Sequence, residues 1–269
     1  ISLQTTPVQG AALTATLSGP VSTTHSFIAS ADRDKRQLPS QNESFLKRHG
    51  WCIGLLGCGV LSFAVDRDLN VLSQKRYLHN GTADSFFEIV EPFGKGRLYF
   101  VSVPLFAGHG LLFNNKKSFT VSGELAIGYI FSQEVTRLLK AAFGRKRPYE
   151  ADSPFKFFEG GSSFYSGHTV TIFTFATIIS KNFPRQNLGF IGLHRDLPVI
   201  PVFSYSLAGL VGIQRLYSNQ HWTSDVFFGA LAGYVIGSAV VHFGGKICLS
   251  SFLIAPGESP IFLWSLHIG

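Results

Sequence analysis

Apolar residues gather in a few stretches along the chain, and most stretches end early at a charge, a proline or a polar cluster. They are Trp51–Val65, Leu98–Phe113, Val121–Phe131, Thr169–Ser180, Val199–Ile213 and Val226–Gly244. The strict alternation of half-buried strands is absent, and runs of about 10–14 residues are more often core helices than membrane spans. Glu124 interrupts one run and Pro201 breaks another, and only Val226–Gly244 approaches the length of a span. The pattern predicts an all-α protein, a globular helical bundle.

The two ends of the chain differ from this middle part. Residues 1–44 are rich in Ser, Thr, Ala, Gln and Pro without hydrophobic periodicity, which is typical of a loosely ordered leader or linker. Residues 45–269 then form one helical domain. Near the C-terminus, the apolar runs Ile247–Ile254 and Ile261–Ile268 enclose a segment rich in Pro and Gly, which predicts a short β-hairpin. The chain begins at Ile1 and contains no Met, which is consistent with a removed export signal.

Composition and charge narrow the class of partner. Hydrophobic residues make up 45% of the chain and charged residues 14%, a balance that suits a deeply buried helical protein or one that touches a membrane. The net charge of +7 favours anionic partners, and nucleic acid is the weakest of them because Arg145–Arg147 is the longest basic run. The three cysteines are Cys52, Cys58 and Cys248. They show neither metal-ligand spacing nor the pattern of a disulfide framework, so the sequence favours three buried free thiols over one disulfide bridge.

The first cluster of chemically useful residues runs from Lys140 to Pro148. Lys140 and Arg147 lie two helical turns apart, and Gly144 and Pro148 indicate that the helix ends between them. Two cations at a helix end can clamp an oxyanion, and Arg can bind it in a bidentate fork. Taken alone, basic residues there often only complement the helix dipole.

Two further clusters each precede an apolar helix. Gly160–Gly167 is a glycine- and serine-rich loop that presents main-chain N–H groups to an anion, and His168 follows it in the first helical turn. In the third cluster, His221 and Asp225 are four residues apart, and Arg215 supplies another cation. A carboxylate bonded to one imidazole nitrogen leaves the other as a nucleophile. A capped helix with an incidental His remains an alternative for either cluster alone.

Together the clusters resemble the tripartite signature of the type-2 phosphatidic acid phosphatase and vanadium haloperoxidase superfamily. That signature reads Lys-x6-Arg-Pro, then Pro-Ser-Gly-His, then Ser-Arg-x5-His-x3-Asp. The matching residues here are Lys140-x6-Arg147-Pro148, Tyr165-Ser166-Gly167-His168 and Gln214-Arg215-x5-His221-x3-Asp225. The resemblance covers roughly residues 60–245. Tyr165 stands where Pro is usual and Gln214 where Ser is usual, which puts substrate preference and full activity in question.

The resemblance implies a helical phosphatase domain over 45–269 that works without a metal or cofactor. It implies that His221 attacks phosphorus, that Asp225 orients it, and that His168 protonates the leaving group. It also implies a phosphate shell made by Lys140, Arg147, Ser166, Gly167 and Arg215. Phosphate or vanadate would fit the same pocket.

Several functional readings stay open at this point. The resemblance favours hydrolysis of a phosphate monoester or pyrophosphate, with a phosphorylated lipid, an isoprenoid phosphate or a small phosphate ester as substrate. A vanadium-dependent haloperoxidase and a non-catalytic phosphate- or phospholipid-binding protein are the alternatives. We expect an exported enzyme, periplasmic or extracytoplasmic, that associates with a membrane through its apolar surface and does not bind nucleic acid.

Overall fold

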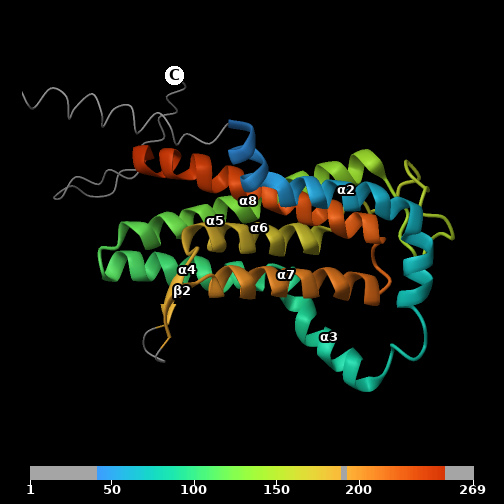
Figure 1. Ribbon diagram of the computed structural model, residues 1–269. Helices are drawn as coiled ribbons and strands as arrows, with labels where there is room; N and C mark the ends of the chain where they lie inside the picture. The colour runs from blue at the N-terminus through green and yellow to red at the C-terminus, as the bar shows by residue number, and fades with distance from the viewer. Residues whose placement is uncertain (1–40, 189–192, 252–269) are drawn as a thin grey trace, which may run out of the picture. The chain divides into compact units, whose positions relative to one another are not determined.

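The computed structural model describes residues 41–188 and 193–251 (Figure 1). The chain divides into two compact units, residues 1–50 and 51–269, and of the first unit only the helical residues 41–50 are described. The described elements are α2 (Gln41–Ser73), α3 (Gly81–Gly94), α4 (Arg97–Leu112), α5 (Lys116–Phe143), α6 (Gly167–Asn182), β1 (Gln186–Leu188), β2 (Leu193–Leu197), α7 (Val199–Tyr217) and α8 (Thr223–Ser251). The prediction of an all-α fold is confirmed.

The helices are longer than the apolar runs that predicted them. α5 has 28 residues, because Ser122 and Glu124 lie on its buried face instead of ending it. The Glu124 carboxyl group accepts a hydrogen bond from Asn182 Nδ2 at 2.6 Å, which gives this buried polar side chain a partner inside the bundle. Pro201 does not break α7, since it lies in the first turn, where main-chain N–H groups have no helical acceptor.

Helix α6 is the centre of the bundle and lies against α5, α7 and α8 (Figure 1). The contact with α8 is close because α8 presents a glycine once per turn, at Gly229, Gly233 and Gly237. Side-chain Cβ atoms there would lie 2.9, 2.6 and 2.9 Å from main-chain oxygens at the start of α6 and along it. Glycine therefore lets the two backbones approach, and this holds the start of α8 beside the start of α6.

Two apolar clusters fill the bundle. The first joins α3, α6 and α7 and is made by Val90, Ile172, Ala176, Ala208 and Val211. The second joins α4, α5, α6 and α8 and is made by Tyr99, Val121, Leu125, Ile178 and Val240. Because α6 contributes to both, the N-terminus of α6 is held on several sides.

The ends of the chain and the cysteines correct three details of the sequence interpretation. Helix α2 already begins at Gln41, so residues 41–44 are helical; residues 1–40 lie outside the described part, and a loosely ordered leader there stays a prediction. The described part of the first C-terminal run, 247–251, is the end of α8 instead of a strand, and the second run lies outside the described residues. A hairpin is found elsewhere, where β1 pairs antiparallel with β2. Cys58 is a free thiol, but it is exposed instead of buried.

Many large apolar side chains of the described helices are exposed. Prominent examples from α2, α4, α7 and α8 are Leu61, Phe100, Leu105, Leu112, Phe203 and Val235. Within residues 41–188 and 193–251, two helical segments are long and apolar enough to cross a membrane by length and composition, Val199–Tyr217 and Thr223–Gly244. The sequence pattern does not predict Val199–Tyr217 as a span, because Pro201 interrupts its apolar run. This surface supports association of the protein with a membrane.

Candidate active site

The three motifs meet at one cavity of about 380 Å³. Its lining contains five of the residues singled out from the sequence, Lys140, Arg147, His168, Arg215 and His221, together with four others, Glu91, Gln214, Ser218 and Gln220. They come from α3, the end of α5, the loop after it, the start of α6, the end of α7 and the turn before α8. Segments far apart in sequence therefore place two imidazoles and three cations around one space.

His221 lies in the turn between α7 and α8 and is 3% exposed. Its Nδ1 is 2.8 Å from the main-chain oxygen of Ser163 and 3.6 Å from Asp225 Oδ2. Both neighbours are acceptors, so Nδ1 carries the hydrogen and donates it to Ser163, which leaves Nε2 with a lone pair. The nearest partner of the ring is thus a main-chain carbonyl group, and Asp225 acts on it mainly by charge. Burial lowers the pKa of His221 despite the raising effect of Asp225, so the imidazole is neutral at neutral pH.

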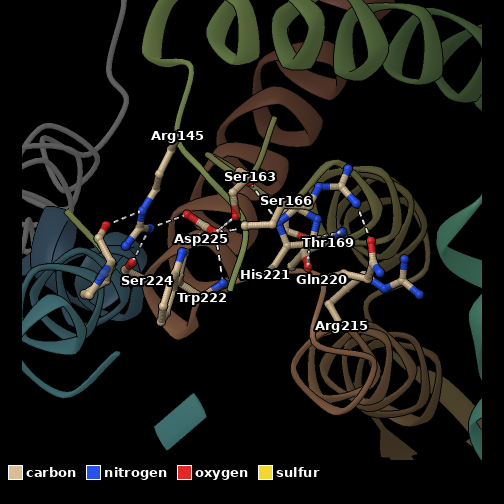
Figure 2. A network of polar contacts seen from close by, with 12 residues as sticks. Arg145, Ser163, Ser166, Thr169, Arg215, Gln220, His221, Trp222, Ser224 and Asp225 are labelled. Carbon is tan, nitrogen blue, oxygen red and sulfur yellow. Dashed lines mark hydrogen bonds and ion pairs between the residues drawn. The ribbon is translucent and has the colours of Figure 1, made fainter. Parts of the chain in front are cut away.

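Asp225 is fully buried and is fixed by hydrogen bonds to both of its oxygens (Figure 2). Oδ2 accepts from Ser163 Oγ and, at 3.0 Å, from the main-chain N–H of Trp222, which caps the start of α8. Oδ1 accepts from Arg145 Nη1. The carboxylate is therefore charged and immobile beside the imidazole.

The loop between α5 and α6 positions the Ser163 carbonyl. Gly144 ends α5 in the left-handed conformation, with φ of 47°, and its carbonyl accepts from Gly161 N at 2.8 Å. Ser163 N donates to Arg145 O at 2.9 Å. A Cβ atom on Gly161 would lie 2.1 Å from the same Arg145 oxygen, so only glycine allows this approach. The first and second motifs are in this way joined through their backbones.

His168 lies in the first turn of α6, where the sequence placed it. Its Nε2 is buried and has no hydrogen-bond partner among the residues that the structure describes. Burial, followed by the charges of Arg215, His221, Lys140 and Lys95, lowers the pKa of His168 to about 3. His168 is therefore neutral at neutral pH, and a bound phosphate dianion would raise its affinity for a proton.

The three cations are held by different partners. Arg147 Nη1 donates to Gln220 Oε1, and Arg215 Nε donates to Gln214 Oε1 at 2.6 Å. Burial and the nearby Arg147 lower the pKa of Lys140 to about 8, although Asp225 opposes the shift. Arg215 Nη2 also lies 3.4 Å from Glu91 Oε1. This carboxylate from α3 therefore partly neutralises the charge of Arg215, one of the three cations expected to bind phosphate.

Two of the predicted phosphate ligands do not line the cavity, and of the two departures from the signature only Gln214 does. Ser166 is fully buried, and its Oγ accepts from Thr169 Oγ1 at 2.9 Å as the cap of α6, so its side chain is not in the cavity lining. Gly167 is not in the lining either, although a Cβ atom on it would lie 3.9 Å from Lys140 Nζ. Tyr165 is buried, whereas Gln214 lines the cavity and orients Arg215.

Sequence reasoning missed four residues at or beside the site. They are Asp66, Glu91, Arg145 and Ser163. The sequence marks only two of these residues, and only weakly. Asp66 is the first charged residue after the apolar run Trp51–Val65, and Arg145 begins the basic triplet. Among the described residues, no group of three or more His, Cys, Asp or Glu side chains is placed to hold a metal ion.

Comparison with known proteins relates part of the chain to a family of phosphatases. The profile of the PAP2 superfamily, the type-2 phosphatidic acid phosphatases, matches residues 122–247. The lipid A 1-phosphatase of Porphyromonas gingivalis is 30% identical over 112 residues, which are 42% of this chain and 21% of that protein. The match thus spans about a fifth of that relative's length.

Two solved structures are similar to this one. The first transmembrane PAP2 type phosphatidylglycerolphosphate phosphatase from Bacillus subtilis matches with a TM-score of 0.53 and 19% identity, over 73% of this chain and 96% of that one. Aquifex aeolicus LpxE matches with a TM-score of 0.46 and 25% identity, over 66% of this chain and 93% of that one. The first of these likenesses shows a shared fold.

Proposed function

Because residues 122–247 belong to the PAP2 superfamily, we propose that this protein is a lipid phosphatase that works through a phosphohistidine on His221. The observation that carries the proposal is the hydrogen bond of 2.8 Å between His221 Nδ1 and the Ser163 carbonyl. It leaves Nε2 as the free nucleophilic atom of a residue that lines a cavity with three cations.

In the first step, the Nε2 lone pair forms a bond to phosphorus while the bond from phosphorus to the ester oxygen breaks. The electron pair of that bond stays on the leaving oxygen, which takes a proton from His168. His168 acquires this proton when the phosphate dianion has bound. The phosphorylated imidazole of His221 is then a cation, and the buried Asp225 carboxylate stabilises it.

In the second step, a water molecule attacks phosphorus and gives its proton to His168, which the first step left neutral. The bond between Nε2 and phosphorus breaks, and its electron pair returns to the ring, so His221 becomes neutral again. Lys140, Arg147 and Arg215 bind the three remaining phosphate oxygens throughout.

These three cations supply the charge neutralisation that Mg²⁺ provides in many phosphoryl-transfer enzymes. The proposed reaction therefore needs no metal ion or cofactor. Hydrolysis that continues unchanged after dialysis against a chelator would support this, and a rate restored only by added Mg²⁺ would contradict it.

The proposed substrate is a phosphorylated lipid or isoprenoid, bound from a membrane. The named activity of the P. gingivalis relative and the exposed apolar side chains of α2, α4 and α7 support this choice. An exported, periplasmic protein remains part of the proposal. A panel of phosphatidate, polyprenyl pyrophosphate and p-nitrophenyl phosphate tests it, and preference for the water-soluble ester would refute the lipid assignment.

The mechanism is tested by two variants and a control. His221→Ala should abolish both turnover and phosphoenzyme formation, whereas His168→Ala should trap label on His221 when the leaving group is good. His242→Ala, at an exposed position of α8, is the matched control. Wild-type turnover by His221→Ala would refute the assignment. Bromide oxidation with vanadate and peroxide would favour a haloperoxidase, and vanadate binding without any phosphate release would favour a binding protein.

A further inference from the structure

A buried cluster of three charged residues connects α2 with the active site. Arg145 lies between two carboxylates: its Nη2 donates to Asp66 Oδ2 at 2.8 Å, and its Nη1 donates to Asp225 Oδ1. All three side chains have no exposed surface. Arg145 Nη1 also donates to Ser224 Oγ at 2.8 Å, and Nε donates to the Pro154 carbonyl at 2.8 Å, so the guanidinium cannot turn away from either acid (Figure 2).

Asp66 also holds the residue next to Asp225. Its Oδ1 accepts from Ser224 N at 2.8 Å, and its Oδ2 accepts from Ser224 Oγ. A helix near the beginning of the chain therefore fixes the first turn of α8, although the two positions are 158 residues apart. Asp66 lies outside the segment that matches the PAP2 superfamily, 122–247.

The surroundings of Arg145 keep water out and preserve the strength of these charges. The rings of Phe63, Phe157 and Trp222 lie 5.1, 4.9 and 5.6 Å from the guanidinium carbon. Buried charges are screened little by salt or solvent. The sum of the charges in the cluster therefore acts directly on the adjacent His221.

That sum depends on Asp66. Two carboxylates and one guanidinium give a net charge of −1, which balances the cation that forms when His221 is phosphorylated. Without the Asp66 charge, Arg145 and Asp225 would neutralise each other, and the phosphorylated imidazole would lie beside a cluster with no net charge. Lys140 and Arg147, which also face His221, would then oppose the new cation without compensation.

We propose that Asp66 is a positioning residue that engages Arg145 and thereby keeps Asp225 effective as the counter-ion of phosphorylated His221. This inference rests on the proposed function. It predicts a loss in the chemical step and not in substrate binding, because the cations that line the cavity are not part of the cluster.

Asp66→Asn tests the charge while it keeps an oxygen acceptor. We expect kcat to fall at least about tenfold while KM changes less than about twofold, since the lost interaction develops only as His221 becomes positive. Asp68→Asn, two residues further along α2 at an exposed position, is the matched control and should keep wild-type kinetics. Unchanged kcat in folded Asp66→Asn would overturn the proposal.

A double variant separates charge from simple structural support. Asp66→Asn with Arg145→Gln removes one acid and one base, so the cluster regains a net charge of −1. We expect its kcat to recover to within about threefold of wild type, whereas a merely structural role predicts a greater loss than in the single variant. A folded double variant slower than Asp66→Asn would overturn the proposal.

The full chain is measured in detergent micelles with dioctanoyl phosphatidate, and folding is checked by the melting of tryptophan fluorescence. Labelled phosphoenzyme is also quantified with each variant in a His168→Ala background. If Asp66→Asn does not fold, the double variant is compared with wild type, and loss of phosphoenzyme in its folded form overturns the proposal. Absence of turnover and phosphoenzyme in wild type would instead refute the proposed function.

Discussion

Replacing Asp225 by Asn measures how strongly a charge behind the nucleophile supports its phosphorylation. Asp225 Oδ2 lies 3.6 Å from His221 Nδ1, and both side chains are buried. With an effective dielectric constant of about 20, two unit charges at this distance attract each other by about 4–5 kcal/mol. Since a tenfold change in rate corresponds to about 1.4 kcal/mol, the loss should reach roughly three orders of magnitude in kcat.

This magnitude is an upper limit, because Arg145 shares the carboxylate with His221. Asn preserves the shape of Asp225, and the Ser163 carbonyl still fixes the imidazole, so binding of vanadate should change little. The assay compares single-turnover phosphate release with vanadate affinity in the same folded preparation. A decrease in kcat of less than tenfold would refute the view that charge at this position drives formation of the phosphohistidine.

Three further outcomes follow from the geometry. Because the pKa of Lys140 is lowered to about 8, kcat/KM should fall as the pH rises through about 8 and Lys140 loses its proton; in Lys140→Arg this fall should disappear from the pH profile. Gly161→Ala should lower the free energy of unfolding by about 1–3 kcal/mol, measured by thermal melting, because its Cβ would lie 2.1 Å from a main-chain oxygen. Gly54→Ala is the control: its Cβ would meet no atom within 4 Å, so this variant should stabilise α2. Glu91→Gln should lower KM several-fold in steady-state kinetics, because it frees Arg215 from its ion pair; an unchanged or higher KM would show that Glu91 does not compete with phosphate.

The sequence alone determined the helical fold and five residues of the cavity wall, Lys140, Arg147, His168, Arg215 and His221. Local chemistry was sufficient for this, because Gly144 ends α5 and Ser166 caps α6 through interactions within a few residues. The spacing of the third motif predicts that His221 and Asp225 are neighbours on one helical face; they are neighbours, but His221 lies in the turn before α8 and not on the helix. Helix lengths were underestimated, since polar residues such as Glu124 satisfy their hydrogen bonds inside the bundle, and only packing reveals that.

Only the tertiary structure decided how the nucleophile is held. The acceptor of the His221 proton is a main-chain oxygen, which every residue type possesses, so no sequence pattern could point to Ser163. The pairing of Asp66 with Arg145 spans 79 residues, and it exists because α2 packs beside the start of α8. Contacts of this kind depend on where the folded backbone brings distant segments together, and the chemistry of the site is set by them.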